Sequence, residues 1–93
     1  MSEVTQNDFE VAFRRMCRRF AAAIMRCMAD TDTSYADIAS RLGISEKKVR
    51  SWMDSLMDGD GEVGLRHIAD MCTALDAEVE FTVTPRKEQL EPA

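Results

Sequence analysis

The sequence predicts a mainly α-helical fold, a compact domain of four helices with one β-strand near the C-terminus. Apolar residues recur every three or four positions over most of the chain, which is the period of an α-helix. Capping residues and glycines interrupt this pattern at several points. The period changes to two only over residues 78–84, which indicates a strand. We therefore expect one domain over residues 1–85 and a disordered tail over residues 86–93.

The first predicted helix is long and runs from a cap at Asn7 or Asp8 to about Ala29. Five arginines and no acidic residue occur in residues 11–29. One interpretation is a long core helix with a solvated basic face. The other is that its first turns pack on a partner subunit, and the arginines could also contact phosphates. The apolar stripe consists of Phe9, Phe13, Met16, Phe20, Ile24 and Met28, widened by Cys17, Ala21 and Cys27.

Two short helices joined by a tight turn are predicted over residues 34–53. Ser34 and Ser45 are suited to cap the two helices, because their hydroxyls can accept free backbone N–H groups. Gly43 can end the first helix in a left-handed conformation, and the small Ala39 lets the helices cross closely. This is the geometry of a helix-turn-helix, whose second helix enters the DNA major groove. The inward-facing residues are Ile38, Ala39, Leu42, Ile44, Val49, Trp52 and Met53.

At these residues the sequence resembles the phage repressor/Cro-like (XRE-type) helix-turn-helix family. The resemblance is carried by Ala39, Gly43 and the apolar residues of the motif, and it extends over residues 65–75. It implies that side chains at the start of the second motif helix contact base edges. The candidate DNA-binding residues are Tyr35, Ser45, Glu46, Lys47, Lys48, Arg50, Ser51 and Arg66.

Each of these residues can make a contact suited to its chemistry. Lys47 and Arg50 can donate to guanine O6 and N7, and Glu46 can accept from cytosine N4. Lys48 is placed for a phosphate contact. Tyr35 stands where related repressors often have a glutamine that supports a base contact, so the chain departs from the family pattern there. A phenol can still donate to a phosphate oxygen; the alternative is a solvent-facing tyrosine without a role.

The chain has about four residues more than the usual family spacing after the motif, which is close to one helical turn. We therefore expect the second motif helix to run to about Met57, before an acidic turn over residues 58–64 that lacks the pattern of a calcium loop. Gly64 is a weak cap for the next helix, where Arg66 could contact a phosphate and His67 is expected at the surface. The inward stripe of that helix is Leu65, Ile68, Ala69, Cys72 and Leu75.

Charge is segregated along the chain. The net charge is −5, unlike that of most DNA-binding domains, but residues 46–53 carry Lys47, Lys48 and Arg50 against Glu46 alone. The sequence contains no nucleophile–base pair, metal-ligand spacing or glycine-rich phosphate loop, so we expect neither an enzyme nor a cofactor. An odd number of cysteines, no signal peptide and no long apolar run indicate a cytoplasmic protein without a membrane segment.

The predicted strand, with Val79, Phe81 and Val83 on one face, has no second strand in the chain to pair with. Backbone groups of a lone strand need a partner, so we expect pairing with a second copy. Some antitoxin-like members of the family look similar at this end. The candidate dimerisation residues are Phe9, Phe13, Val79, Phe81 and Val83.

The function expected from these features is sequence-specific DNA binding by a homodimeric transcriptional regulator. It would repress, often at its own promoter, by reading an inverted-repeat operator through the major groove. The alternative is an antitoxin or antiactivator that acts by binding a toxin or activator protein. The acidic net charge and the apolar Phe9/Phe13 end favour the alternative, whereas the basic residues 46–53 favour DNA.

Overall fold

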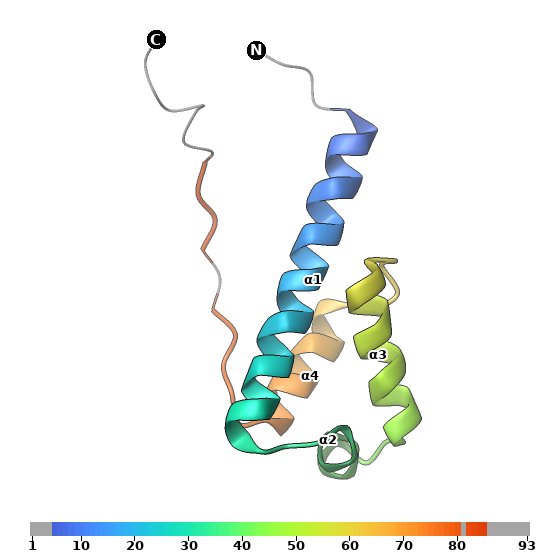
Figure 1. Ribbon diagram of the computed structural model, residues 1–93, viewed down its shortest axis with the longest axis vertical. Coiled ribbons are helices and arrows are strands. Elements are labelled where there is room, and N and C mark those ends of the chain that lie inside the picture. The colour runs from blue at the N-terminus through green and yellow to red at the C-terminus, as the bar shows by residue number, and fades with distance from the viewer. Residues whose placement is uncertain (1–4, 81, 86–93) are drawn as a thin grey trace.

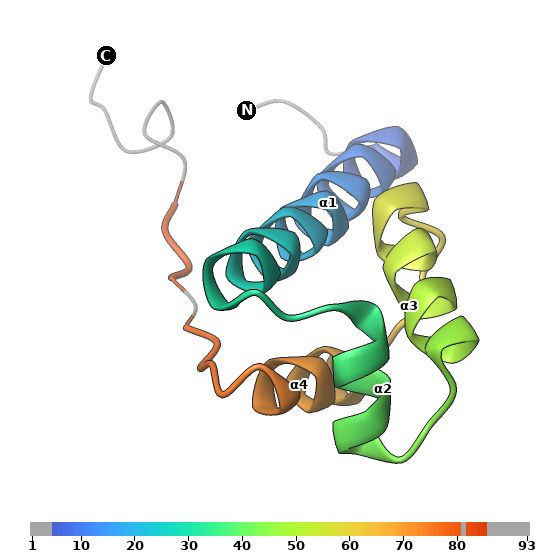
Figure 2. The same cartoon turned by 60° about the horizontal axis from the view of Figure 1, so that its bottom comes forward.

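The computed structural model describes residues 5–80 and 82–85, which form four helices (Figure 1). These are α1 (Gln6–Thr31), α2 (Tyr35–Leu42), α3 (Glu46–Asp58) and α4 (Leu65–Ala74). The long α1 packs along α3, and its first turns project beyond the other helices. Figure 2 shows α2 and α4 together beside the later turns of α1, with α3 on the side away from the C-terminal segment. The predicted four-helix order is therefore confirmed.

α1 begins earlier and ends later than predicted. Its N-cap is Thr5, whose hydroxyl accepts from Asp8 N at 3.2 Å while Asp8 Oδ2 accepts from Thr5 N at 2.9 Å. This reciprocal pair satisfies two backbone donors, which explains why Thr5 caps the helix rather than Asn7 or Asp8. At the other end, Asp32 adopts a left-handed conformation with φ of 53° and terminates the helix.

The buried face of α1 differs from the predicted stripe. Its buried residues are Cys17, Ala21 and Ile24, whereas Phe9 is 60% exposed and Met16 is 46% exposed. Phe20 and Met28 also pack against the core, whereas Phe9 and Met16 lie on exposed parts of the helix. The interpretation of α1 as a core helix along its whole apolar stripe therefore does not hold for Phe9, Phe13 and Met16, which are exposed in the single chain.

The hydrophobic core lies where α1, α3 and α4 meet over α2. Its fully buried large side chains are Ile38, Val49, Met53, Leu56 and Met71. The predicted inward face of α4 was correct for Ile68, Cys72 and Leu75. It was wrong for Ala69, which is exposed, and for Leu65, which is 68% exposed. Leu65 is the first residue of its helix, beyond the edge of the core. Within the described ranges, no helix is long and apolar enough to cross a membrane.

The predicted extra turn of α3 is confirmed, since the helix ends at Asp58, and this turn packs on α1. Gly59 adopts a left-handed conformation with φ of 68° and is buried beneath Arg14. A Cβ atom at Gly59 would lie 2.7 Å from Cγ and 3.0 Å from Cα of Arg14. Arg18 Nε donates to Met57 O at 3.2 Å and so satisfies a carbonyl at the C-terminus of α3.

A capping box starts α2. Asp37 Oδ2 accepts from Ser34 N at 2.9 Å, and Ser34 Oγ accepts from Asp37 N at 3.1 Å. The hydrogen bonds from Ser34, first from its backbone, lower the pKa of Asp37 below its ordinary value of 3.8, and Arg41 adds a smaller effect in the same direction. At the end of α2, Arg41 Nη1 donates to Ala74 O at 2.6 Å, which connects α2 with the last turn of α4.

The predicted strand over residues 78–84 is absent from residues 78–80 and 82–84, the part of it that the structure describes. Residues 77–80 and 82–85 are neither helical nor paired as a strand, and they run alongside α1 (Figure 1). After the hydrogen bond from Ala77 N to Cys72 O, residues 78–80 and 82–85 make no backbone hydrogen bond to another described residue. A strand requires a neighbouring strand, and none exists in the described part of this single chain. Phe81 and the expected tail over residues 86–93 lie outside the described residues.

We expect alanine at Gly59 and at Gly43 to separate backbone strain from steric conflict. Both glycines have positive φ, but nothing lies within 4 Å of a Cβ atom at Gly43. Gly43→Ala should lower the free energy of unfolding by about 1 kcal/mol, the cost of the left-handed conformation. Gly59→Ala should cost at least about 2 kcal/mol, because Arg14 must also move. Urea denaturation measures both; equal losses would contradict the close packing of α1 on Gly59.

We expect acid to remove the stabilising effect of Asp37. Because the pKa of folded Asp37 is lowered, its ionised form stabilises the fold above the ordinary pKa, and this contribution is lost as the pH falls through the lowered value. Asp37→Asn should therefore reduce the melting temperature at pH 6. In acid, the melting temperatures of the variant and the wild type should approach each other. Asp54→Asn is the control, because Asp54 is exposed and makes no hydrogen bond to a described side chain. A difference in melting temperature between Asp37→Asn and the wild type that stayed the same from pH 6 to pH 2 would contradict the capping role.

Candidate nucleic-acid interface

The turn between α2 and α3 is closed by backbone hydrogen bonds. Gly43 has φ of 70° and donates from its N–H to Ser40 O at 3.3 Å, and Ile44 N donates to Ala39 O at 3.0 Å. Ile38 and Ala39 are buried at the helix crossing, and Ile44 packs against the core. The predicted helix-turn-helix geometry of residues 34–53 is therefore present.

The N-terminus of α3 is capped by Ser45, whose Oγ accepts from Lys48 N at 3.1 Å. Val49 and Met53 are fully buried and Trp52 is half-buried against the core, so these three residues fix the rotation of the helix. The remaining side chains at this end all face solvent. They are Glu46, Lys47, Lys48, Arg50 and Ser51.

One of these side chains is held by its neighbours. The Arg50 guanidinium carbon lies 5.2 Å from the centre of the Tyr35 ring, and Arg50 Nε lies 3.6 Å from Glu46 Oε2. Tyr35 is half-buried and packs against the core, so the alternative of a purely solvent-facing tyrosine does not describe it. The structure thus brings together three of the predicted site residues, from the starts of α2 and α3.

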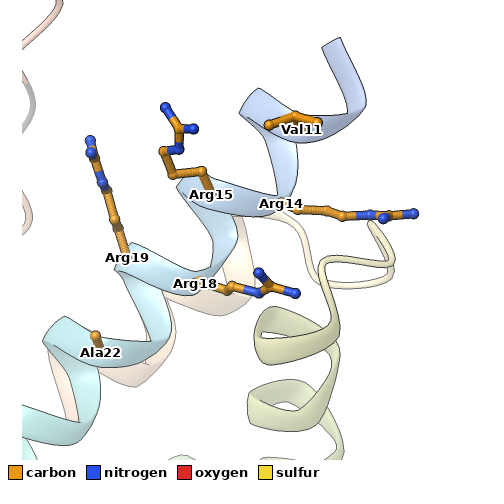
Figure 3. Close-up of a pocket in the computed structure, with 6 residues that line it drawn as sticks. All are labelled: Val11, Arg14, Arg15, Arg18, Arg19 and Ala22. Atoms are coloured by element: carbon orange, nitrogen blue, oxygen red, sulfur yellow. The ribbon is translucent and has the colours of Figure 1, made fainter. Parts of the chain in front are cut away.

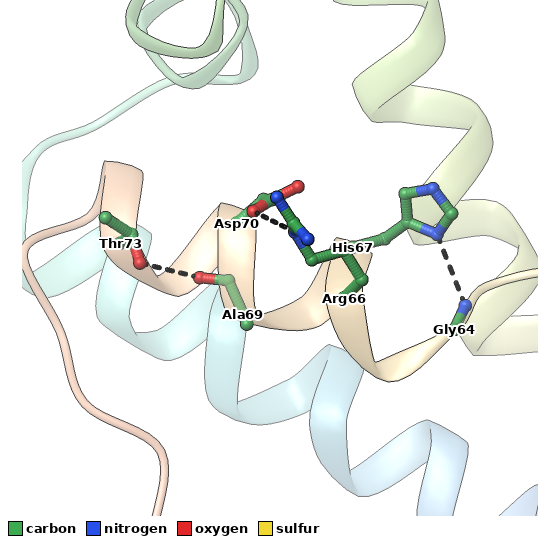
Figure 4. A network of polar contacts seen from close by, with 6 residues as sticks. All are labelled: Gly64, Arg66, His67, Ala69, Asp70 and Thr73. Atoms are coloured by element: carbon green, nitrogen blue, oxygen red, sulfur yellow. Dashed lines mark hydrogen bonds and ion pairs between the residues drawn. The ribbon is translucent and has the colours of Figure 1, made fainter.

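Arg66 and His67, at the start of α4, have local partners (Figure 4). Arg66 Nε lies 3.4 Å from Asp70 Oδ1, while its side chain stays 88% exposed. His67 Nδ1 accepts from Gly64 N at 3.3 Å and replaces the missing cap side chain of the glycine. The His67 ring also lies 4.5 Å from the Trp52 ring, centre to centre.

The contacts of His67 connect α4 with α3 and were not predicted. A histidine three positions after a glycine cap is the sequence signal that could have indicated this role, since that position can accept from the cap N–H. The prediction of a surface histidine was wrong, because His67 is half-buried. Its position fixes the start of α4 beside α3, where Arg66 projects into solvent.

The arginines of α1 do not join this surface. Figure 3 shows Arg14 and Arg18 directed toward α3 and its following turn, and Arg15 and Arg19 directed to the other side of α1. Arg18 contacts the carbonyl of Met57, which lies about 15 Å along α3 from Lys47 by helix rise. The basic row of α1 is thus separated from the exposed N-terminal face of α3.

The acidic turn after α3 is held by hydrogen bonds within the turn. Asp60 Oδ1 accepts from Glu62 N at 2.9 Å, and Ser55 Oγ donates to Asp60 Oδ2 at 3.3 Å. These contacts use the carboxylate to order the backbone, as in an Asx turn. In the part of the chain that the structure describes, no group of three His, Cys, Asp or Glu residues is placed to hold a metal ion.

The two buried cysteines behave as apolar core residues. Burial, followed by a smaller effect of Asp60, raises the pKa of Cys17, and burial raises the pKa of Cys72 with a smaller effect of Cys27. A raised pKa disfavours the reactive thiolate, so neither thiol is activated as a nucleophile.

Comparison with known proteins gives a result that agrees with this geometry. The model of a family described as a helix-turn-helix domain matches residues 22–69, which extend from the second half of α1 through α2 and α3 into α4. No curated protein and no solved structure matches the chain. The matched region is 48 of the 93 residues and includes every exposed side chain of the α3 N-terminus. On this evidence, the chain belongs to the helix-turn-helix domain family, in which DNA binding is the expected activity.

Proposed function

We propose that this protein is a sequence-specific DNA-binding transcriptional regulator that reads the major groove with α3. The observation that carries the proposal is the division of α3 into a buried face and an exposed polar end. Val49 and Met53 anchor the helix in the core, and Glu46, Lys47, Lys48, Arg50 and Ser51 remain exposed. Within the helix-turn-helix family, we assign the chain to the repressor/Cro-like (XRE-type) branch, on the motif residues given above.

The exposed end of α3 offers distinct contacts to DNA. Lys47 and Arg50 donate to guanine, and Lys48 neutralises a phosphate. Ser51 lies one position beyond Arg50 and offers a hydroxyl to a further base edge or phosphate. Ser45 acts chiefly as the helix cap, because its oxygen already accepts from Lys48 N. Arg66, exposed at the start of α4, supplies a phosphate contact outside the recognition helix.

The proposed regulator acts as a homodimer on an inverted repeat. Two copies would place their recognition helices about 34 Å apart, in successive major grooves. Apolar groups that lack a partner in the described chain support this assembly, since Phe9, Phe13, Val79 and Val83 are exposed. A groove between α1 and residues 77–80 and 82–83 is lined by Met16, Phe20 and Val79, among others, and continues this apolar surface. A chain of this size would repress by occluding a promoter, its own among them.

A second candidate function is binding of a protein partner, as in an antitoxin or antiactivator. The exposed apolar turns of α1 favour it, with Phe9 at 60% exposure, as does the net charge of −5. The two functions use different surfaces, because the exposed turns of α1 are remote from the N-terminus of α3.

We expect Lys47→Ala combined with Arg50→Ala to abolish specific DNA binding without unfolding the protein. Both side chains are exposed and neither contributes to the core, so the melting temperature should change little. Loss of two base contacts should weaken binding to the preferred duplex by at least about 100-fold. The preferred duplex is selected from a randomised pool with the wild type. Its dissociation constants for the wild type and the variant are then measured by fluorescence anisotropy.

The matched control for this pair is Arg15→Gln combined with Arg19→Gln. This variant also removes two positive charges, but from the face of α1 directed away from α3. Specific affinity and its salt dependence should stay close to those of the wild type. If the α1 pair reduced binding as much as the α3 pair, the assignment of α3 as the reading helix would be wrong.

We expect Val83→Glu to dissociate the homodimer. Val83 is 96% exposed in the single chain, so the substitution removes no intrachain packing. A carboxylate buried in a dimer interface would oppose association strongly. Sedimentation equilibrium should therefore show a wild-type mass of twice 10.5 kDa and a monomeric variant. A variant that sediments as the wild-type dimer would exclude the segment over residues 78–84 from the interface.

A further inference from the structure

We infer that Tyr35 is a positioning residue that orients Arg50 toward one guanine of the operator, while Glu46 acts as the second support of Arg50. The inference rests on the proposed DNA-binding function and adds to it a specificity-determining residue outside the recognition helix. Three contacts carry it: the ring of Tyr35 against the core, the guanidinium of Arg50 over that ring, and the Arg50–Glu46 ion pair.

The Tyr35 ring gives a fixed surface at the edge of the exposed face. Tyr35 is the first residue of α2, directly after the Ser34 cap, and its ring packs against the hydrophobic core. The Arg50 guanidinium carbon lies 5.2 Å from the ring centre, within the range of a cation–π contact. An aromatic ring held by the core therefore restricts the rotamers of a solvent-exposed arginine.

Glu46 restrains the same side chain from within α3. Its Oε2 lies 3.6 Å from Arg50 Nε, one helical turn away, and the two side chains remain 46% and 59% exposed. Because Nε faces the carboxylate, the two terminal Nη groups are left for an outside acceptor. This end-on pair matches the O6 and N7 acceptors of guanine. Glu46 then supports Arg50 rather than reading cytosine, which differs from the role expected from sequence.

Lys47 and Lys48 provide the contrast. Both are exposed, and neither ammonium group makes an ion pair or hydrogen bond within residues 5–80 and 82–85. Their charge is available to DNA, but ordering either side chain on binding costs rotamer entropy. Arg50 has lost part of that freedom in the free protein, and a preset arginine fork discriminates among bases better than a flexible ammonium. The structure thus assigns the more selective base contact to Arg50, a less directed base contact to Lys47 and phosphate attraction to Lys48.

The experiment compares guanine preference rather than overall affinity. The wild type first selects preferred duplexes from a randomised pool. These duplexes are then synthesised again with one guanine at a time replaced by adenine. Arg50 reads the position at which this replacement weakens binding of the wild type but not of Arg50→Ala. At this position the ratio of dissociation constants is measured for wild type, Tyr35→Phe, Tyr35→Leu and Tyr35→Met. A contact from the Tyr35 hydroxyl to a phosphate changes both constants equally and cancels from the ratio.

We expect the two variants without a ring, Tyr35→Leu and Tyr35→Met, to lower this ratio by about two- to fivefold, the range of an exposed cation–π contact. Tyr35→Phe keeps the ring and should restore the wild-type ratio, even where loss of the hydroxyl weakens binding. In the Arg50→Ala background, Tyr35→Leu should have no effect on the ratio. Tyr35→Met serves as the second variant should Tyr35→Leu fold poorly, because methionine adapts to an apolar site without a ring and offers no amide to Arg50.

Several results would overturn the inference. An unchanged guanine ratio in both Tyr35→Leu and Tyr35→Met would show that Tyr35 has only a structural or phosphate-binding role. A reduced ratio in Tyr35→Phe equal to that in Tyr35→Leu would assign the effect to the hydroxyl. If the wild type selects no preferred duplex at all, the proposed function itself fails, and this outcome is distinct from the other two.

Discussion

The crossing of α2 and α3 is the constraint on which the exposed surface depends. Ile38 and Val49 have no solvent exposure, and the backbone hydrogen bond from Ile44 to Ala39 fixes the turn between their helices. An α-helix advances 100° per residue, so burial of Val49, Met53 and Leu56 leaves no freedom in the direction of Glu46, Lys47 and Arg50. The packing of α2 against α3 thus determines which side chains the protein exposes to solvent at the N-terminus of α3.

The lengths of α1 and α3 are matched through one contact region. The additional turn of α3 ends under Arg14, where Gly59 allows close approach, and Arg18 satisfies the carbonyl of Met57. These contacts hold the C-terminal end of α3 against α1 and leave its N-terminal end free. Arg14 and Arg18, which the sequence alone places on a solvated basic helix face, therefore stabilise the scaffold. The proposed recognition face is built from other basic residues.

Features encoded by nearby residues were predictable, and features that depend on distant partners were not. The Ser34 and Ser45 caps, the Gly43 turn and the longer α3 follow from local signals, and all are present. The error in the α1 stripe has a tertiary cause, because periodicity cannot show how far along a helix its neighbours extend. The absent strand has the same cause, since alternation of Val79 and Val83 encodes a strand only when another strand is adjacent. The Tyr35–Arg50 contact joins two helices across the turn and has no signature in either helix alone.

The acidic composition is compatible with the DNA-reading surface that we propose, because charge is divided along α3. Its N-terminal half carries Lys47, Lys48 and Arg50, while Asp54 and Asp58 lie in its C-terminal half. Screening limits each group to a range of about 10 Å, so the two ends act separately. Few basic residues near DNA release few counterions, and non-specific affinity is then low. Under this condition discrimination must come from directed hydrogen bonds, and a guanidinium already oriented by Tyr35 and Glu46 is a direct way to obtain it.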